Sequence, residues 1–243
     1  MERNNQLQSD HAAWLSEHDF FVKELDLILP EESFDGPMQM ALDEVLLRRV
    51  KKPTLRIYQW KAPCVSFGYF QKLAEVQRTF PNLPSVRRWT GGGLVEHGGD
   101  ITFSLMIPKG DPVAMMPPAQ FYKELHGRVA RWLSALLFSK VSLAGEGDCR
   151  PGNACFTAPA CDDLLLEGKK VLGGAQRRSS GALLYQGSLQ GVRQAMPAFD
   201  PVGLGEALGS VLSEGDSLTP ELKAEALALR ESRYCRAEWN RRR

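Results

Sequence analysis

Two segments of the chain carry apolar residues at the spacing of three and four that is typical of an amphipathic helix. The first follows Asp35-Gly36-Pro37, a favourable helix start with proline in the first turn, and ends before Pro53. The second covers residues 118–138, where one apolar stripe runs from Phe121 to Leu137. The sequence therefore predicts two helices, the second with one apolar stripe.

Shorter apolar segments bounded by turn residues predict strands. They cover residues 54–60, 64–67, 85–89, 100–107 and 182–189, and a hairpin over 163–172 turns at Gly168. From residue 201 onward helix-forming residues dominate, and Thr219-Pro220 opens a further helix. Because strands fill the middle and helices the ends, we expect an α+β fold with a single domain over 1–243. Residues 1–20 are expected to be a mobile lead-in and 201–243 a helical segment.

Composition and charge exclude several classes of protein. The 243 residues carry 30 Lys and Arg against 29 Asp and Glu, and a net charge of +1 excludes nucleic-acid binding by bulk electrostatics. No apolar run approaches the length of a membrane span, and the polar first residues indicate no secretion signal. Five cysteines, an odd number, predict reduced thiols in a cytoplasmic protein rather than a disulfide framework.

A glycine triplet behind two arginines is the first candidate for chemistry. Gly91, Gly92 and Gly93 would let backbone N–H groups approach a ligand closely. Arg87 and Arg88 offer donors for a carboxylate or phosphate. The segment has neither the Gly-Lys-Ser/Thr of a phosphate-binding loop nor the spacing of a dinucleotide-binding loop. The alternative is an ordinary glycine-rich turn between strands, with solvated arginines.

Cys155 lies between proline and glycine residues, in a segment expected to be an exposed loop where a thiolate can act as a nucleophile. An incidental cysteine is the alternative. Cys149, Cys155 and Cys161 are equally spaced, which suggests metal binding, but zinc sites usually contain a pair two to four residues apart and no histidine completes the set. We therefore expect no metal.

Lys170 lies in the predicted hairpin. Strand alternation places Lys169 and Lys170 on opposite faces, so one of them should point away from solvent. A partly buried ammonium beside Gly173 and Gly174 can stabilise negative charge that develops on a carbonyl or phosphate oxygen. A solubilising surface lysine is the alternative. His97 is either a hydrogen-bond donor to a ligand or a structural histidine.

Five segments, in order along the chain, resemble successive motifs of the biotin/lipoate protein ligase catalytic domain family, in its lipoate-protein ligase A and octanoyltransferase branch. They are Gly36-Pro-Met-Gln-Met-Ala-Leu-Asp-Glu44, Leu55-Arg-Ile-Tyr-Gln-Trp60, Val65-Ser-Phe-Gly-Tyr-Phe-Gln71, Arg87-Arg-Trp-Thr-Gly-Gly-Gly-Leu-Val-Glu-His97 and Gly168-Lys-Lys-Val-Leu-Gly-Gly-Ala-Gln-Arg-Arg178. The resemblance implies a mixed, mostly antiparallel sheet flanked by helices, similar to the core of class II aminoacyl-tRNA synthetases.

The resemblance also implies a substrate, lipoate or an octanoyl group, that is attached to one lysine of a lipoyl domain. Lys170 matches the family lysine that contacts the acyl carbonyl. The positions implied to bind the acyl group or its adenylate are Arg88, Thr90, Gly91, Gly92, Gly93, Leu94, His97, Gly173 and Gly174.

Two activities share this scaffold. An ATP-dependent ligase forms an acyl-adenylate and needs phosphate and magnesium contacts, whereas a transferase takes the acyl group from acyl carrier protein onto its own cysteine. The segment around Cys155 resembles the nucleophile loop of cysteine-dependent octanoyltransferases, and residues 97–104 are closer to that group as well. We therefore expect a transferase with Cys155 and Lys170 as catalytic residues and no tightly bound cofactor. ATP and magnesium enter only in the ligase alternative.

Two features depart from the transferase pattern. A glycine triplet is common among the ligases, and Gln186 stands where both groups usually have a histidine. Glutamine cannot take up and return a proton, so the general base of the reaction is open, with His97 or water as substitutes. Biotin-protein ligase and a non-catalytic acyl-binding relative are further alternatives.

The expected partners are lipoyl domains and acyl carrier protein, which are generally acidic. Basic side chains that could receive them are Arg48, Arg49, Lys51, Lys52 and Arg241–Arg243, and the alternative is a solvated helix end and tail. No membrane partner is expected, and a monomer is the working expectation.

Overall fold

The computed structural model describes residues 21–149, 159–191, 199–215 and 218–242. The strands are β1 (Val22–Ile28), β2 (Thr54–Tyr58), β3 (Cys64–Phe67), β4 (Ser85–Arg87), β5 (Val95–His97), β6 (Ile101–Ile107), β7 (Val141–Leu143), β8 (Leu164–Leu166), β9 (Lys169–Ser179), β10 (Ala182–Leu189) and β11 (Gly209–Gly215). The helices are α2 (Gly36–Arg49), α3 (Leu73–Thr79), α4 (Pro112–Met115), α5 (Pro118–Leu137), α6 (Pro201–Glu206), α7 (Pro220–Leu229) and α8 (Ala237–Asn240), with a π-helical turn η1 (Arg230–Tyr234).

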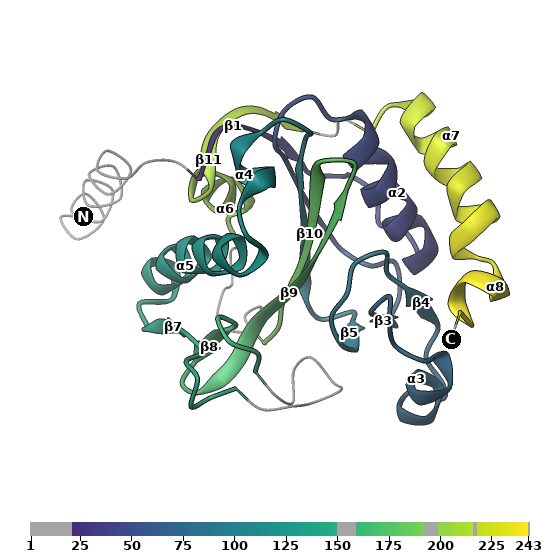
Figure 1. The fold of residues 1–243 in the computed structure, drawn as a ribbon, viewed down its shortest axis with the longest axis horizontal. Coiled ribbons are helices and arrows are strands. Elements are labelled where there is room, and N and C mark those ends of the chain that lie inside the picture. Colours follow the sequence, from purple (N-terminus) through teal and green to yellow (C-terminus); the bar gives the residue numbers. More distant parts are fainter. Residues whose placement is uncertain (1–20, 150–158, 192–198, 216–217, 243) are drawn as a thin grey trace.

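Within the described residues, eight strands form one sheet in the order β11-β1-β2-β6-β10-β9-β8-β7, and three form a second sheet in the order β4-β3-β5. Strand β1 pairs in parallel with β2 and β11. From β2 across to β7 the neighbouring strands are antiparallel. Helices α2 and α7 lie on one side of the large sheet and α5 on the other (Figure 1). The predicted α+β fold with a mixed, mostly antiparallel sheet is confirmed.

Helix α2 begins where the sequence predicts. The Asp35 carboxylate accepts the backbone N–H of Met38 at 2.9 Å, and proline occupies the first turn. The burial goes beyond the residues at helical spacing, because almost every residue of the helix is buried, Asp43 and Glu44 included. The large sheet covers one side of α2, and α7 and η1 cover the other.

Helix α5 follows its predicted stripe. Phe121, Leu125, Val129 and Leu133 are fully buried against the opposite face of the sheet. The helix ends at Phe138, whose φ of 49° breaks the helical repeat. Among the described residues, no helix is both long and apolar enough to cross a membrane.

The hairpin of β8 and β9 turns at Glu167 and Gly168, whose φ angles are 51° and 75°. Two successive positive φ angles are typical of a tight type I′ turn, which favours glycine. Lys169 is exposed, whereas the side chain of Lys170 is 4% exposed. The predicted alternation, with one lysine turned away from solvent, is confirmed.

Strands β1 and β11 were not predicted. They lie near the two ends of the chain and pair in parallel, with Leu25 opposite Val211. The segment 201–243 therefore contains a strand among its helices, because residues 209–215 extend the sheet beside β1. The lead-in predicted over 1–20 lies outside the described residues.

Candidate active site

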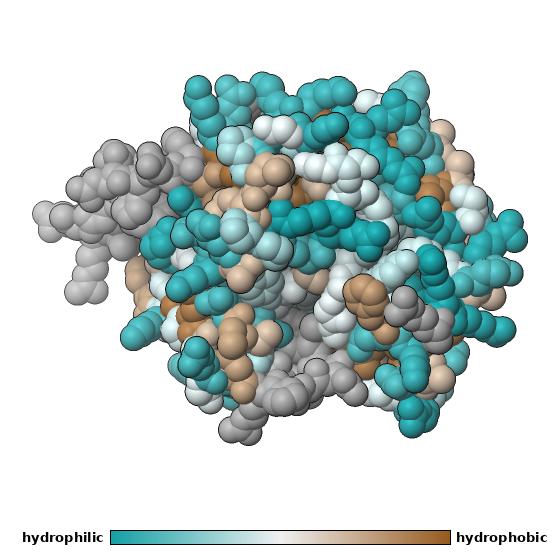
Figure 2. Space-filling view, in the orientation of Figure 1, coloured by the Kyte–Doolittle hydropathy of each residue, from teal (hydrophilic) through white to brown (hydrophobic). Residues whose placement is uncertain are grey.

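A largely apolar cavity opens between the small sheet and strands β9 and β10. The empty space in the cavity and at its mouth is about 370 Å³. The small sheet and its loop contribute Ser66, Arg88, Val95 and His97, and β9 contributes Gly173–Ala175. The other lining residues are Met40, Tyr58, Trp60, Thr102, Gln186, Gly187 and Ser188. Figure 2 shows the molecular surface hollowed between these two parts.

Ser66, His97 and Asp100 form a hydrogen-bonded series along one wall of the cavity. Ser66 Oγ lies 2.6 Å from His97 Nε2, and His97 Nδ1 lies 2.8 Å from Asp100 Oδ2. A carboxylate only accepts, so Nδ1 carries the proton, and Nε2 of the neutral ring accepts the Ser66 hydroxyl. The ring of Trp60 stacks on His97 with a centroid distance of 3.9 Å. The sequence pattern indicated His97 but neither of its partners.

Burial is the main influence on the two ionisable members of this series. It lowers the pKa of His97, and hydrogen bonding to Asp100 offsets this only in part. Burial alone would raise the pKa of Asp100, but hydrogen bonds from His97, Thr102 and Ser188 outweigh it and hold the pKa below its ordinary value. His97 is therefore neutral and Asp100 ionised at neutral pH.

Both arginines before the glycine triplet are engaged within the protein. Arg88 donates to the carbonyls of Gly91 at 2.9 Å and Gly93 at 2.8 Å, and to Ser66 Oγ at 2.7 Å. Arg87 is fully buried and donates to backbone carbonyls of the C-terminal segment, including Trp239. The alternative of solvated arginines is wrong, because both guanidinium groups are buried and donate hydrogen bonds to backbone carbonyls. Gly91–Gly93 lie next to Arg88 but are not among the residues that line the described cavity.

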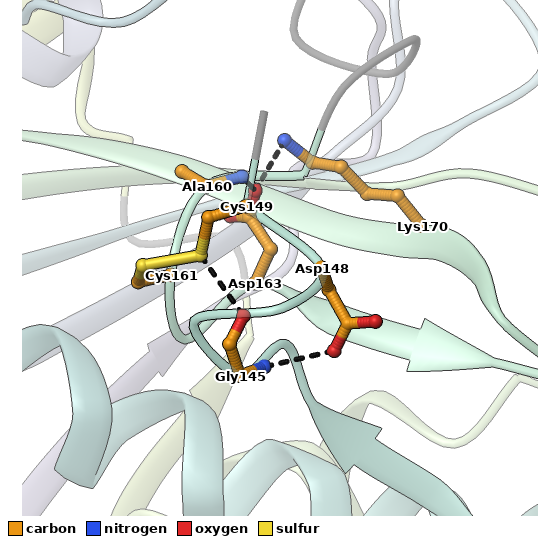
Figure 3. The surroundings of a disulfide bond; sticks show 7 residues. All are labelled: Gly145, Asp148, Cys149, Ala160, Cys161, Asp163 and Lys170. Carbon is orange, nitrogen blue, oxygen red and sulfur yellow. Dashed lines mark hydrogen bonds and ion pairs between the residues drawn. A yellow bond between two sulfur atoms is a disulfide. The ribbon is translucent and has the colours of Figure 1, made fainter. Parts of the chain in front are cut away.

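Lys170 forms a buried ion pair at the edge of the cavity. Its Nζ lies 2.6 Å from Asp163 Oδ2, and the two side chains are 4% and 1% exposed (Figure 3). Tyr122 of α5 donates to the other carboxylate oxygen at 2.6 Å. A Cβ on Gly173 would lie 2.6 Å from Lys170 Cε and 2.7 Å from Nζ. Glycine at 173 thus leaves room for the ammonium beside the backbone that lines the cavity, and the surface-lysine alternative is wrong.

A buried histidine supports this part of the site from α5. His126 Nδ1 lies 2.7 Å from the Asp162 carbonyl, so it donates, and Nε2 accepts the Tyr185 hydroxyl at 2.6 Å. Burial lowers the pKa of His126 to about 3. The neighbouring Tyr122 hydroxyl also accepts the N–H of Gly174 at 3.0 Å. Helix α5 therefore fixes both the start of β8 and the glycines of β9.

Cys149 and Cys161 form a disulfide, with 5.5 Å between their Cα atoms (Figure 3). The prediction of reduced thiols is wrong for this pair. Backbone hydrogen bonds between Ala144 and residues 162–163 bring the end of β7 beside the start of β8, a juxtaposition that cysteine spacing does not reveal. Cys155, the predicted nucleophile, lies outside the described residues. Among the residues described, no group of three or more His, Cys, Asp and Glu could hold a metal ion.

The remaining predicted positions have local roles. Gln186 accepts the Thr90 hydroxyl at 2.6 Å and donates to Asp43 Oδ2 at 2.7 Å, so it joins the glycine-loop segment to α2. Leu94 packs in a small hydrophobic cluster with Val65 and Phe67.

Asp163 and Ser66 were not predicted from the sequence. The weak signal for Asp163 is a carboxylate placed directly before three leucines.

Comparison with known proteins identifies the family. A model of the lipoyl protein ligase A/B catalytic domain matches residues 35–192, which include the whole cavity lining. The chain belongs to this family. Octanoyltransferase LipM of Clostridioides difficile is 34% identical over 173 residues, which cover 67% of this chain and 64% of the relative. Octanoyltransferase LipM of Brevibacillus brevis is 38% identical over 178 residues, covering 65% and 63%. The chain thus matches less than two thirds of the length of these relatives.

Solved structures share the fold. Protein Ta0514 from T. acidophilum with bound lipoic acid superposes with a TM-score of 0.69 at 23% identity, covering 90% of this chain and 100% of that one. A lipoate-protein ligase A bound with ATP superposes with a TM-score of 0.65 at 21% identity, covering 90% and 98%.

Proposed function

We propose that the protein attaches an octanoyl or lipoyl group to a lysine of a lipoyl domain, by acyl transfer through a cysteine thioester. The observation that carries this proposal is the Lys170 ammonium, which lies against Gly173 where that glycine lines an apolar cavity. The curated relatives named octanoyltransferase support the same activity.

The cavity suits a straight acyl chain. Met40, Trp60 and Val95 supply apolar surface, and Gly173, Gly174 and Gly187 add backbone without side chains to the lining. Burial of a methylene group contributes about 0.8 kcal/mol, so the chain of an octanoyl group would provide most of its binding energy here. The polar carbonyl end then requires a donor, and the ammonium beside Gly173 is one.

In the first half-reaction, the Cys155 thiolate attacks the acyl carbonyl of a carrier thioester, and the carrier thiolate leaves as its C–S bond breaks. In the second, the neutral ε-amine of the acceptor lysine attacks the enzyme thioester and gives up one proton to water, and Cys155 leaves as thiolate as its C–S bond breaks. Negative charge develops on the carbonyl oxygen both times. Lys170 stabilises it, because an ammonium in a site shielded from water is a strong hydrogen-bond donor. Asp163 holds the lysine in position, and Tyr122 donates to the other oxygen of that carboxylate.

Acyl carrier protein as donor and a lipoyl domain as acceptor are the proposed partners, and the octanoyl or lipoyl group is substrate. The basic residues at the end of α2 and directly after it are less available than the sequence suggested. Arg49 pairs with Glu225 and Lys52 with Glu24, at 2.6 Å and 3.1 Å, and Arg48 pairs with Glu44. The cytoplasmic location stays a prediction from sequence.

An acyl-transfer assay with apo-lipoyl domain, octanoyl carrier protein and the full chain, run with and without ATP, tests the proposal. We expect transfer without ATP and its loss in Cys155→Ser. Activity that requires ATP, uses free acid and survives Cys155→Ser would instead establish the ligase that the glycine triplet favours. No product under either condition would support a non-catalytic acyl-binding protein.

A further inference from the structure

The proposed transfer reaction leaves one reactive arrangement of the cavity unused. Ser66, His97 and Asp100 follow one another at hydrogen-bond distance, and Ser66 and His97 line the cavity. A hydroxyl, a neutral imidazole and a carboxylate in this order form the nucleophile, base and orienting group of serine hydrolases on unrelated folds. Such an arrangement is identified by geometry and not by sequence position.

The base is held in one tautomer and orientation. Asp100 Oδ2 accepts from the Thr102 and Ser188 hydroxyls at 2.6 Å and 2.7 Å, in addition to His97 Nδ1. These contacts fix the carboxylate, and Trp60 covers the imidazole face. His97 Nε2 therefore faces Ser66 Oγ as a proton acceptor.

The nucleophile is polarised from its other side. Arg88 Nη1 donates to Ser66 Oγ at 2.7 Å, and Ser66 is 1% exposed to bulk solvent. A fixed guanidinium stabilises negative charge on the oxygen as the hydroxyl proton leaves, and the shielded site strengthens that interaction. Ser66 lies on β3, across the cavity from the glycines of β9 beside which Lys170 is held.

We propose that Ser66 is a second acyl-accepting nucleophile of this cavity, which forms an oxyester from medium-chain acyl thioesters or activated esters and hydrolyses it. The proposal rests on the proposed function in one respect, that the cavity takes an acyl chain. Ser66 Oγ attacks the carbonyl carbon while His97 Nε2 takes the hydroxyl proton, the C–S bond breaks, and the leaving thiolate receives that proton. Water then attacks the ester and gives a proton to His97. Ser66 Oγ regains this proton as its bond to the acyl carbon breaks, and the fatty acid is released.

An octyl fluorophosphonate tests Ser66 directly in the full chain. The probe forms an O–P bond with an activated serine as its P–F bond breaks and fluoride leaves. We expect labelling of one residue, mapped to Ser66 by peptide mass spectrometry, and none in Ser66→Ala. His97→Gln, which cannot take up the proton, should be labelled about 100-fold more slowly.

Ser104→Ala is the matched control, because like Ser66→Ala it removes one buried serine hydroxyl. The Ser104 hydroxyl donates to the Asp43 carboxylate. It should be labelled at the wild-type rate. A wild-type protein that stays unlabelled, or that is labelled at a residue other than Ser66, overturns the proposal, and neither result depends on a variant folding. The rate of p-nitrophenyl octanoate hydrolysis should vary among these proteins in the same way as the rate of labelling.

The two proposals fail separately. An unlabelled protein that still octanoylates a lipoyl domain removes the role of Ser66 and leaves the transfer reaction intact. Labelling at Ser66, with ester hydrolysis but without transfer to a lipoyl domain, removes the transfer reaction and supports the serine site.

Discussion

Two buried ion pairs, Arg56 with Asp43 and Lys170 with Asp163, differ in the chemistry of the cation. Both side chains of the first pair are 0% exposed, and the atoms lie 2.7 Å apart. Gln39 Oε1 accepts a hydrogen bond from the second guanidinium nitrogen of Arg56, and Asp43 also accepts from Ser104 and Gln186. Arginine cannot lose its proton and is fixed by its planar donors, so this pair joins α2 rigidly to the sheet.

Lys170 is a single ammonium on a flexible stem, held by Asp163 beside a glycine. Lysine can rotate its donors and move when its partner is removed. The contrast indicates that a buried arginine pair serves the fold, whereas a buried lysine pair next to a cavity can serve chemistry.

Removal of the carboxylate should separate the two pairs most strongly. Asp43→Asn leaves a permanent buried charge on Arg56 and should lower the free energy of unfolding by about 3–5 kcal/mol. Asp163→Asn keeps an amide oxygen beside the flexible Lys170 ammonium and should lower it by about 1–3 kcal/mol. Urea unfolding of both variants at pH 7 measures the difference. Equal losses would contradict the distinction between the pairs.

Removal of the lysine should slow octanoyl transfer. Lys170→Ala should reduce octanoyl transfer about 100-fold or more, the cost of losing one donor to a developing oxyanion. Lys169→Ala, one residue away and exposed, is the control and should retain the wild-type rate. A near-normal rate for Lys170→Ala would limit the lysine to a structural role.

The stability of the protein should also be sensitive to acid, through His126 on α5. His126 has a pKa of about 3 in the folded protein against 6.5 for the ordinary side chain. Below pH 6.5 the unfolded chain binds a proton that the folded chain does not, so stability falls as pH falls toward 3. Between pH 6.5 and 5 this contribution is about 2 kcal/mol. Urea midpoints across this range should fall less steeply in His126→Gln, and parallel curves would show that His126 does not contribute.

A methyl group at Gly173 should displace the ammonium with the smallest effect of the four. The added Cβ would overlap Lys170 Cε, and the flexible lysine can move aside. We expect octanoyl transfer to fall about tenfold with little change in thermal midpoint, because misplacement of a catalytic group costs rate and not folding energy. Gly127→Ala on α5, where only an arginine nitrogen lies near the added Cβ, is the control. An unchanged rate in Gly173→Ala would show that the close approach of Lys170 to Gly173 does not matter for transfer.

Local signals predicted much of the fold. The Asp35 cap, the α5 stripe and the turn at Gly168 depend on neighbours a few residues away, and the structure has each of them. Strands β1 and β11 were missed because their pairing joins residues near opposite ends of the chain.

The same limit applies to the site. Alternation in a hairpin predicted that one lysine would be buried, and the family motifs singled out His97. The partners were not predictable, since Tyr122 reaches Asp163 across 41 residues and Ser66 reaches His97 across 31. Contacts of this kind arise only once the sheet is assembled.

The central claim is that an acyl chain in this cavity presents its carbonyl to Lys170 and reacts with Cys155. Mass spectrometry of the full chain mixed with octanoyl carrier protein, followed by peptide mapping, tests it most directly. The account predicts an octanoyl adduct on Cys155, released by hydroxylamine as a thioester, and a much slower Cys155 adduct in Lys170→Ala. A protein without an adduct on Cys155, or one that is acylated as fast without Lys170, would contradict it.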